Sequence, residues 1–294
     1  MKSLFFQSQT GYKVSFESAD ISPGETPDEY LIGAYLPGIT LTKDNTNVGL
    51  SIRFEESPVK QLVRMGDVLI IKDTWNNKFS LDLWHLLYSV FRLDYIKHGF
   101  FPVHASCVGK EKMALLVAHS GMGKTTLALR LMNDLDWQIF SGNKTFIDFS
   151  RGFHAIAGTK TVSIRSEDFN KYPNLVDDSS AFSDRIAFDL PARHISSSAS
   201  VPISAIFIVK IDDGQDGIEE IISPSNLHLL YPFFLDTVYA DTVLCGGEAV
   251  FSGNIDDSSK SRLSAFLRSA LNKVKVYNLK GSVSFMADQV KNLT

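Results

Sequence analysis

Cysteine is scarce in this chain, with two residues, Cys107 and Cys245, among 294. Two cysteines are too few for the disulfide framework of a small secreted domain, so we expect two reduced thiols that act as small buried hydrophobic residues. The N-terminal apolar run, residues 4–6, is too short for the core of a signal peptide. Both observations lead us to expect a cytoplasmic protein.

Long apolar runs and an excess of one charge are also missing. No apolar run approaches the roughly 20 residues that a membrane helix requires, so we expect no membrane insertion. Lys and Arg number 29 and Asp and Glu number 33, and this net charge of −4 does not suggest a nucleic-acid partner. With 44% hydrophobic and 21% charged residues, the composition excludes a wholly disordered chain and is typical of a globular protein.

The first part of the chain has the pattern of strands. Apolar residues alternate with smaller or polar ones over residues 48–54, and residues 68–71 form a short apolar run. Between residues 83 and 91, apolar residues recur at spacings of three and one, which predicts a helix with an apolar stripe. We therefore predict a β-rich N-terminal module over residues 1–96 that ends in a linking helix.

The rest of the chain, residues 97–294, has the pattern of an α/β domain. Short apolar runs are separated by turn-forming residues and by segments with helical periodicity. The predicted elements are strands over 103–108, 113–117, 162–164 and 203–211, and helices over 125–135, about 225–240 and about 258–272.

A glycine-rich stretch between a predicted strand and a predicted helix carries the strongest chemical signal. Residues 118–125, AHSGMGKT, match the phosphate-loop pattern G-x-x-x-x-G-K-[ST] except that alanine takes the first position. Glycines at 121 and 123 allow backbone N–H groups to turn toward phosphate oxygens, and the following helix directs its positive end at the same anion.

This motif predicts ATP and Mg²⁺ as ligands. The Lys124 ammonium would contact the β- and γ-phosphates, and the Thr125 hydroxyl would be a ligand of Mg²⁺. No readable motif contacts the base, so GTP stays an alternative to ATP. The loop residues predicted to bind nucleotide are Ser120, Gly121, Met122, Gly123, Lys124, Thr125 and Thr126.

The stretch from residue 104 to residue 128 resembles a known family. His104-Ala105-Ser106, a short hairpin and the loop with its helix look like the catalytic domain of HPr kinase/phosphorylase. They look still more like the related bacterial kinases that accompany peptide-tailoring and polysaccharide gene clusters. The resemblance covers residues 80–290. It implies an α/β P-loop domain that transfers phosphate from ATP to a hydroxyl of a small molecule or peptide, and it suggests a homo-oligomer.

The chain departs from this family where its catalytic acids are expected. The family has two adjacent aspartates after the strand that follows the loop helix, and one of them is the general base. Here that stretch reads SGNKT over residues 141–145, and no register supplies a carboxylate. We include Asn143 among the predicted catalytic-site residues, with a neutral carbonyl oxygen to offer but no basic atom. Three residues remain as candidates to replace the acids, Asp148 as a displaced metal ligand or base and His104 or His119 as a base.

Two lysines lie near the positions of the missing acids. If Lys144 and Lys160 both face the phosphates, the site is more cationic and favours a polyphosphate or an anionic second substrate. The alternative is that both are solvated surface lysines. Two functions therefore stay open, an ATP-dependent phosphotransferase and a nucleotide-binding regulator or assembly protein with little or no catalysis. The sequence does not identify the acceptor.

Overall fold

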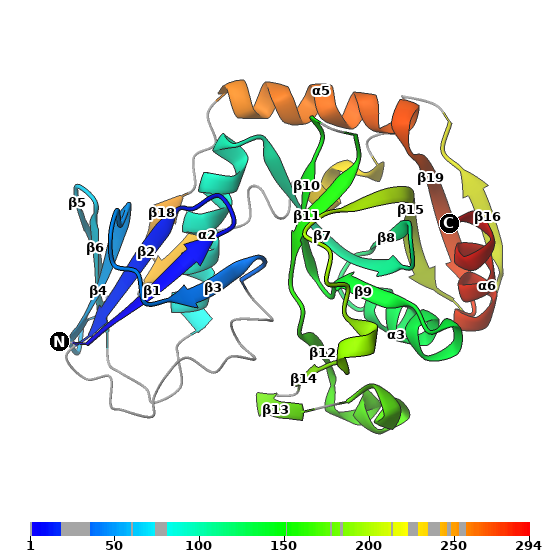
Figure 1. Cartoon of the computed structure of the whole chain (residues 1–294), viewed down its shortest axis with the longest axis horizontal. Helices are drawn as coiled ribbons and strands as arrows, with labels where there is room; N and C mark the ends of the chain where they lie inside the picture. Colours follow the sequence, from blue (N-terminus) through cyan, green and yellow to red (C-terminus); the bar gives the residue numbers. More distant parts are fainter. Residues whose placement is uncertain are drawn as a thin grey trace.

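A computed structural model shows a mixed α/β fold with two large sheets and few helices among the residues that it describes. In Figure 1 the N-terminal sheet lies on the left, and the larger sheet with its helices lies on the right. The described residues are 2–18, 36–59, 61–73, 81–150, 152–176, 178–182, 185–212, 214–222, 229–234, 242–245, 248–252 and 257–294.

The N-terminal sheet is mixed and has six strands in the order β3-β1-β2-β4-β6-β5. The alternation over residues 48–54 corresponds to β4, where Leu50, Ile52 and Phe54 are buried in one core with helix α2 (Leu81–Lys97). Pairings β2–β4 and β4–β6 are parallel. The strands are β1 (Lys2–Ser8), β2 (Lys13–Ser18), β3 (Ile39–Thr42), β4 (Leu50–Glu56), β5 (Gln61–Met65) and β6 (Val68–Asp73).

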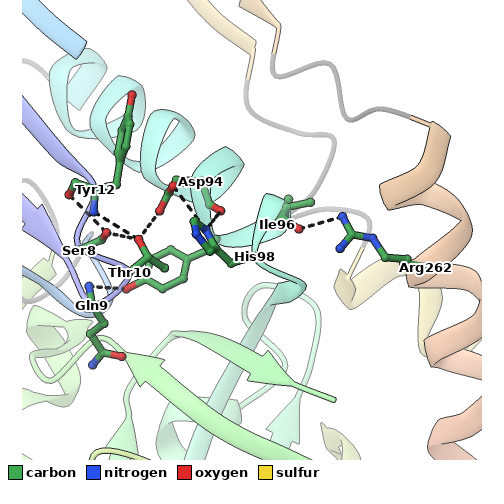
Figure 2. Close-up of polar contacts among 9 residues, drawn as sticks. Ser8, Gln9, Thr10, Tyr12, Asp94, Ile96, His98 and Arg262 are labelled. Carbon is green, nitrogen blue, oxygen red and sulfur yellow. Dashed lines mark hydrogen bonds and ion pairs between the residues drawn. The ribbon is translucent and has the colours of Figure 1, made fainter. Parts of the chain in front are cut away.

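Polar contacts join the β1–β2 turn to the C-terminal end of α2 (Figure 2). The Thr10 hydroxyl donates to the Asp94 carboxylate, and Nδ1 of His98 lies 2.9 Å from the carbonyl oxygen of Asp94. From the other side, Nη2 of Arg262 donates to the carbonyl oxygen of Ile96 at 3.3 Å. This last contact ties α2 to helix α5 (Asp257–Lys273), which runs along the top of Figure 1.

The larger sheet has eight strands in the order β11-β10-β7-β8-β15-β19-β16, with β9 paired to β7. Strands β8, β15 and β19 are parallel, so their carboxyl ends open at one edge. In α/β sheets this edge is where ligands bind. The strands are β7 (Phe100–Gly109), β8 (Met113–Val117), β9 (Gln138–Ser141), β10 (Lys144–Asp148), β11 (His154–Gly158), β15 (Val201–Ile211), β16 (Gly217–Glu220) and β19 (Lys275–Gly281).

Helices cover both faces of this sheet. Successive side chains of a strand point to opposite faces, and β8 follows this rule. Leu115 is buried in the core that includes Leu267 of α5, whereas Leu116 is buried in the core that includes Leu127 and Met286. The second core is formed by α3 (Lys124–Leu135) and α6 (Val283–Leu293), which lie together at the lower right of Figure 1.

Smaller elements complete the described part of the chain. A three-stranded antiparallel sheet lies beside α3, and short 3₁₀ helices precede and follow its strands. These elements are β12 (Val162–Arg165), β13 (Asp178–Phe182), β14 (Arg185–Asp189), η1 (Ser166–Lys171), η2 (Pro173–Leu175) and η3 (Ala192–His194). Strands β17 (Thr242–Cys245) and β18 (Glu248–Ser252) pair in a separate two-stranded sheet.

The helix predictions have different outcomes. Those over 125–135 and about 258–272 are confirmed by α3 and α5. Of the helix expected over about 225–240, the structure describes residues 229–234, and residues 231–234 are helical. The remainder of that prediction lies outside the described residues, and helix α6 was not expected.

Cys107 is a buried thiol in β7, as expected, and burial raises its pKa. The side chain of Cys245 lies outside the described part of the chain. None of the described helices combines the length and the apolar character that crossing a bilayer requires.

Candidate functional site

The glycine-rich loop joins the carboxyl end of β8 to α3. Gly121 and Gly123 have φ angles of +79° and +97°, a backbone conformation that glycine adopts without strain. A Cβ atom on Gly123 would lie 2.1 Å from Cδ1 of Ile211, the last residue of β15. The Ile211 amide also donates to the carbonyl oxygen of Met122 at 3.0 Å. The loop is therefore held against the neighbouring parallel strand, and position 123 has no room for a side chain.

The first turn of α3 faces the edge of the sheet without a cap. Gly123, which precedes the helix, makes no side-chain capping bond, and the first turn has no acidic residue. The Leu127 amide donates to the carbonyl oxygen of Gly123 at 2.9 Å, so the amides of residues 124–126 precede the helical ladder. These amides and the positive end of the helix dipole together favour an anion at this position.

Lys124, Asn143 and His104 form a connected polar chain. Nζ of Lys124 donates to Oδ1 of Asn143 at 3.0 Å, and the same oxygen lies 2.9 Å from Nε2 of His104. Because an ammonium group only donates hydrogen bonds, the Asn143 atom that it contacts is the oxygen. Nε2 of His104 must then carry the hydrogen, which leaves Nδ1 as the acceptor of the neutral ring.

The polar chain lies in a buried environment. Lys124 is only 6% exposed. Burial, together with the positive charge of Lys124, lowers the pKa of His104 to about 4. The imidazole is therefore neutral at pH 7, and it cannot use Nε2 as a base while that atom donates to Asn143.

Thr159 holds the strand connection that carries Asn143. Its buried hydroxyl accepts hydrogen bonds from the amides of Asn143 and Lys144, at 3.0 and 3.2 Å. This fixes the tight β9–β10 turn and aims the Asn143 side chain at Lys124. Sequence reasoning did not identify Thr159, because a threonine after a glycine has no distinctive pattern.

A cavity of about 400 Å³ opens in front of the loop. Among the described residues that line it, Asp168 of η1 is the only carboxylate, and it lies 2.5 Å from Nζ of Lys171. Leu129, Ile164 and Tyr172 give the cavity an apolar side. Its other lining residues are His104, His119, Ser120, Gly121, Gly123, Lys124, Thr125, Thr126, Gly142, Asn143, Thr161, Ser163 and Arg165.

Most of the predicted loop residues meet at this cavity. Asn143 joins them from the β9–β10 turn and His104 joins them from β7. Met122 is 38% exposed and does not line the cavity. Asp168 was missed by sequence analysis, since it lies in a short polar stretch without periodicity. Among the described residues, no group of three His, Cys, Asp or Glu side chains is placed to bind a metal ion.

The predicted lysines point elsewhere. Nζ of Lys144 lies 3.5 Å from the centre of the Tyr88 ring on α2. Nζ of Lys160 donates to the carbonyl oxygen of Phe140 at 2.8 Å. Neither lysine lines the loop cavity.

Asp148 is not brought to the loop either. It is buried at the far end of β10, opposite Phe100, and its Oδ1 accepts from the amide and the hydroxyl of Ser150, each at 2.8 Å. A strand rises about 3.3 Å per residue, so Asp148 is roughly 13 Å along β10 from Lys144.

The comparisons with known proteins found similar chains among solved structures. No family model matches the sequence. No curated protein matches it either. Among solved structures, the Hpr(Ser) kinase/phosphatase from Coxiella burnetii is similar at a TM-score of 0.30 and 8% sequence identity, covering 65% of this chain and 92% of that chain. The functional assignment therefore rests on the geometry of the site.

Proposed function

We propose that this chain binds ATP, with the polyphosphate seated on the loop over residues 118–126. The observation that carries this proposal is the uncapped, acid-free start of α3 beside the buried ammonium of Lys124, both facing one cavity. Backbone amides and an ammonium group are the donors that phosphate oxygens require. The open space around a Cβ at Gly121 leaves room for phosphate next to the backbone.

The rest of the cavity suits a nucleoside better than inorganic phosphate. Its volume of about 400 Å³ exceeds what a phosphate group fills, and Leu129, Ile164 and Tyr172 add an apolar surface for a base or sugar. The Thr125 hydroxyl and one oxygen of Asp168 are the groups that would bind Mg²⁺ together with phosphate oxygens. Bound nucleotide would supply a transferable phosphoryl group.

Binding with little turnover is the activity that the polar chain supports best. A general base must accept a proton from the acceptor hydroxyl. Asn143 has no basic atom, and Nε2 of His104 already donates to it. The remaining acceptor, Nδ1 of His104, is a weak base because the pKa of the ring is lowered to about 4. These features of the protein therefore fit a nucleotide-binding regulator or assembly protein.

Phosphoryl transfer is a second candidate, and Asp168 is the observation in its favour. Its carboxylate lines the same cavity as Lys124 and Thr125. Release of Lys171 from Asp168 would leave this carboxylate able to bind Mg²⁺ or to accept a proton.

Two measurements test these proposals. ATP should raise the melting temperature of the parent protein and of Lys112→Ala, a change in the exposed β7–β8 turn, but not of Lys124→Ala. Steady release of phosphate from ATP in the presence of Mg²⁺, abolished by Asp168→Asn, would favour the transferase. Absence of release together with the melting shift would favour the regulator, and absence of any shift would contradict both.

A further inference from the structure

A second and larger cavity, of about 690 Å³, lies between the two large sheets. The N-terminal half contributes residues 7–9 at the end of β1, Leu36 and Gly38 before β3, and Ile39 and Thr40 at its start. The other half contributes Phe140 of β9, Ala157 and Gly158 at the end of β11, Lys160 shortly after it, and the serine-rich segment over 196–199. The cavity therefore exists only where both sheets come together.

The walls of this interdomain cavity are packed. A Cβ on Gly38, whose φ is +67°, would lie 2.7 Å from Cβ of Ala157 on β11. The Tyr95 hydroxyl of α2 donates to the Gly38 carbonyl oxygen at 3.4 Å, and the Gln9 amide lies 3.5 Å from that hydroxyl. Figure 2 shows the Gln9 side chain extending from the turn away from Thr10. Direct contact between the two halves makes the cavity a fixed feature.

Lys160 is the single cation among the described residues that line this cavity, and they include no carboxylate. Its ammonium donates to the Phe140 carbonyl oxygen at 2.8 Å and lies 4.2 Å from the centre of the Phe140 ring. An ammonium group has three donor hydrogens, so this one acceptor leaves donors for a ligand. Burial lowers the pKa of Lys160, and an anion beside it would offset that penalty.

Neutral hydrogen-bonding side chains line the same cavity as Lys160. They give the cavity amide and hydroxyl groups on both walls, and Leu36 and Ile39 add an apolar part. One cation among several neutral polar groups matches a ligand with one acidic group and several hydroxyl or amide groups. The polar lining residues are Gln7, Ser8, Gln9, Thr40, Ser196, Ser197 and Ser198.

We propose that the interdomain cavity binds a small organic anion, through a carboxylate or a phosphate that pairs with Lys160. This site has its own walls and its own cation, so it does not depend on nucleotide binding at the loop.

The two cavities share one segment of chain. Thr159 holds the amide of Asn143, Lys160 faces the interdomain cavity, and Thr161 lines the loop cavity. An anion at Lys160 therefore acts on the segment that positions Asn143. Any effect on nucleotide affinity must be reciprocal, since coupling between two binding equilibria is symmetric.

Calorimetric titration tests the anion site. The loop also attracts phosphate, so every protein in these titrations carries Lys124→Ala as a background change. Inorganic phosphate and citrate are the two separate probes. We expect at least one probe to bind with a Kd of about 1 mM or tighter. Adding Lys160→Gln should weaken that binding about tenfold or more, and adding the exposed Lys112→Gln should leave it unchanged. The stronger probe distinguishes a phosphate site from a carboxylate site.

A second variant covers the case in which Lys160→Gln fails to fold. Ser197→Asp keeps Lys160 and places a carboxylate in the same lining, so it should also weaken the probe about tenfold. Lys160→Arg keeps the positive charge and should retain binding within about tenfold. No saturable binding of either probe to the Lys124→Ala background would overturn the proposal. Equal affinity in that background with and without a folded Lys160→Gln or Ser197→Asp change would overturn it as well.

Discussion

At the scale of single residues, Asn143 determines the chemistry of the loop cavity. It accepts from Lys124 and from His104 through one oxygen, so it links a cation to a neutral imidazole. A carboxylate in the same position would pair with both and would also bind metal or accept a proton. The carboxamide keeps the geometry and lacks the charge.

Asn143→Asp should raise the pKa of His104 from about 4 toward or above its usual value near 6.5. An opposite charge 2.9 Å away favours the imidazolium, which offsets burial and the positive charge of Lys124. NMR titration of the imidazole protons measures this shift. Asn133→Asp on the exposed side of α3 is the matched control and should leave the His104 pKa near 4. An unchanged pKa in Asn143→Asp would contradict the observed contact.

His104 should also make folding depend on pH. Its folded pKa of about 4 lies below the unfolded value of 6.5, so the unfolded chain binds a proton first as pH falls. Stability is complete above pH 6.5 and decreases between about pH 6.5 and 4, by up to about 3 kcal/mol.

Urea unfolding at pH 7 and pH 4.5 checks this dependence. His104→Gln should remove the part of the stability loss that comes from His104. The His98 side chain is 52% exposed, so His98→Gln should keep the full loss. The same pH dependence in the parent and in His104→Gln would mean that His104 titrates normally in the folded protein.

At the scale of elements, the connection from β8 to α3 depends on Gly123. Both loop glycines have a left-handed backbone, but only Gly123 faces a neighbouring side chain at contact distance. A Cβ on Gly121 would meet open space, whereas a Cβ on Gly123 would meet Ile211. The two positions therefore separate backbone strain from crowding.

Gly121→Ala should destabilise the protein by about 1 kcal/mol, the cost of alanine at positive φ, and Gly123→Ala should cost more because Ile211 must also move. Urea unfolding measures both losses. In a double-mutant cycle, Ile211→Ala should recover the crowding part of the Gly123→Ala loss. Equal losses at the two glycines would contradict the close packing of the loop on β15.

Sequence patterns predicted the elements whose own residues carry several local signals. The strand, the glycine-rich turn and the helix around Lys124 each carry their own periodicity or spacing, so β8 and α3 were found from residues alone. Helix α6 was missed, although Ser282 caps it by accepting from the Phe285 amide at 3.3 Å. The helix is only 11 residues long, so its apolar residues repeat the helical period few times and the periodic signal is weak.

The polar part of the site was harder to predict, because strand direction decides which neighbours meet. Asp148 is close to Asn143 in sequence, yet β10 carries it to the opposite end of the strand. Asp168 is distant in sequence and reaches the cavity through the turn after β12. Spacing along a chain does not give these distances without the pairing of the strands.

At the scale of the whole molecule, helix α2 packs on both large sheets. The Tyr95 ring stacks on Phe146 of β10 with ring centres 4.1 Å apart. Phe146 and Ala157 from the larger sheet are buried in the same core as Phe6 and Phe16 of the N-terminal sheet. This shared core joins the two halves.

The two halves should therefore unfold together. Differential scanning calorimetry of the parent protein should show one transition whose calorimetric and van't Hoff enthalpies agree. Phe146→Ala should remove about 3–5 kcal/mol of stability, since it empties the shared core. Two separate transitions in the parent protein would show that the sheets fold independently and that the interdomain cavity lacks fixed walls.

Nucleotide binding at the loop is tested most directly by calorimetric titration of the parent protein, Lys124→Ala and Lys112→Ala with ATP, each with and without Mg²⁺. We expect saturable ATP binding to the parent and to Lys112→Ala, and its loss in Lys124→Ala. Stronger binding with Mg²⁺ would show that Thr125 and Asp168 support a metal ion. ATP binding of equal affinity in the parent and in Lys124→Ala, or no binding to either, would contradict the assignment of the loop as a nucleotide site.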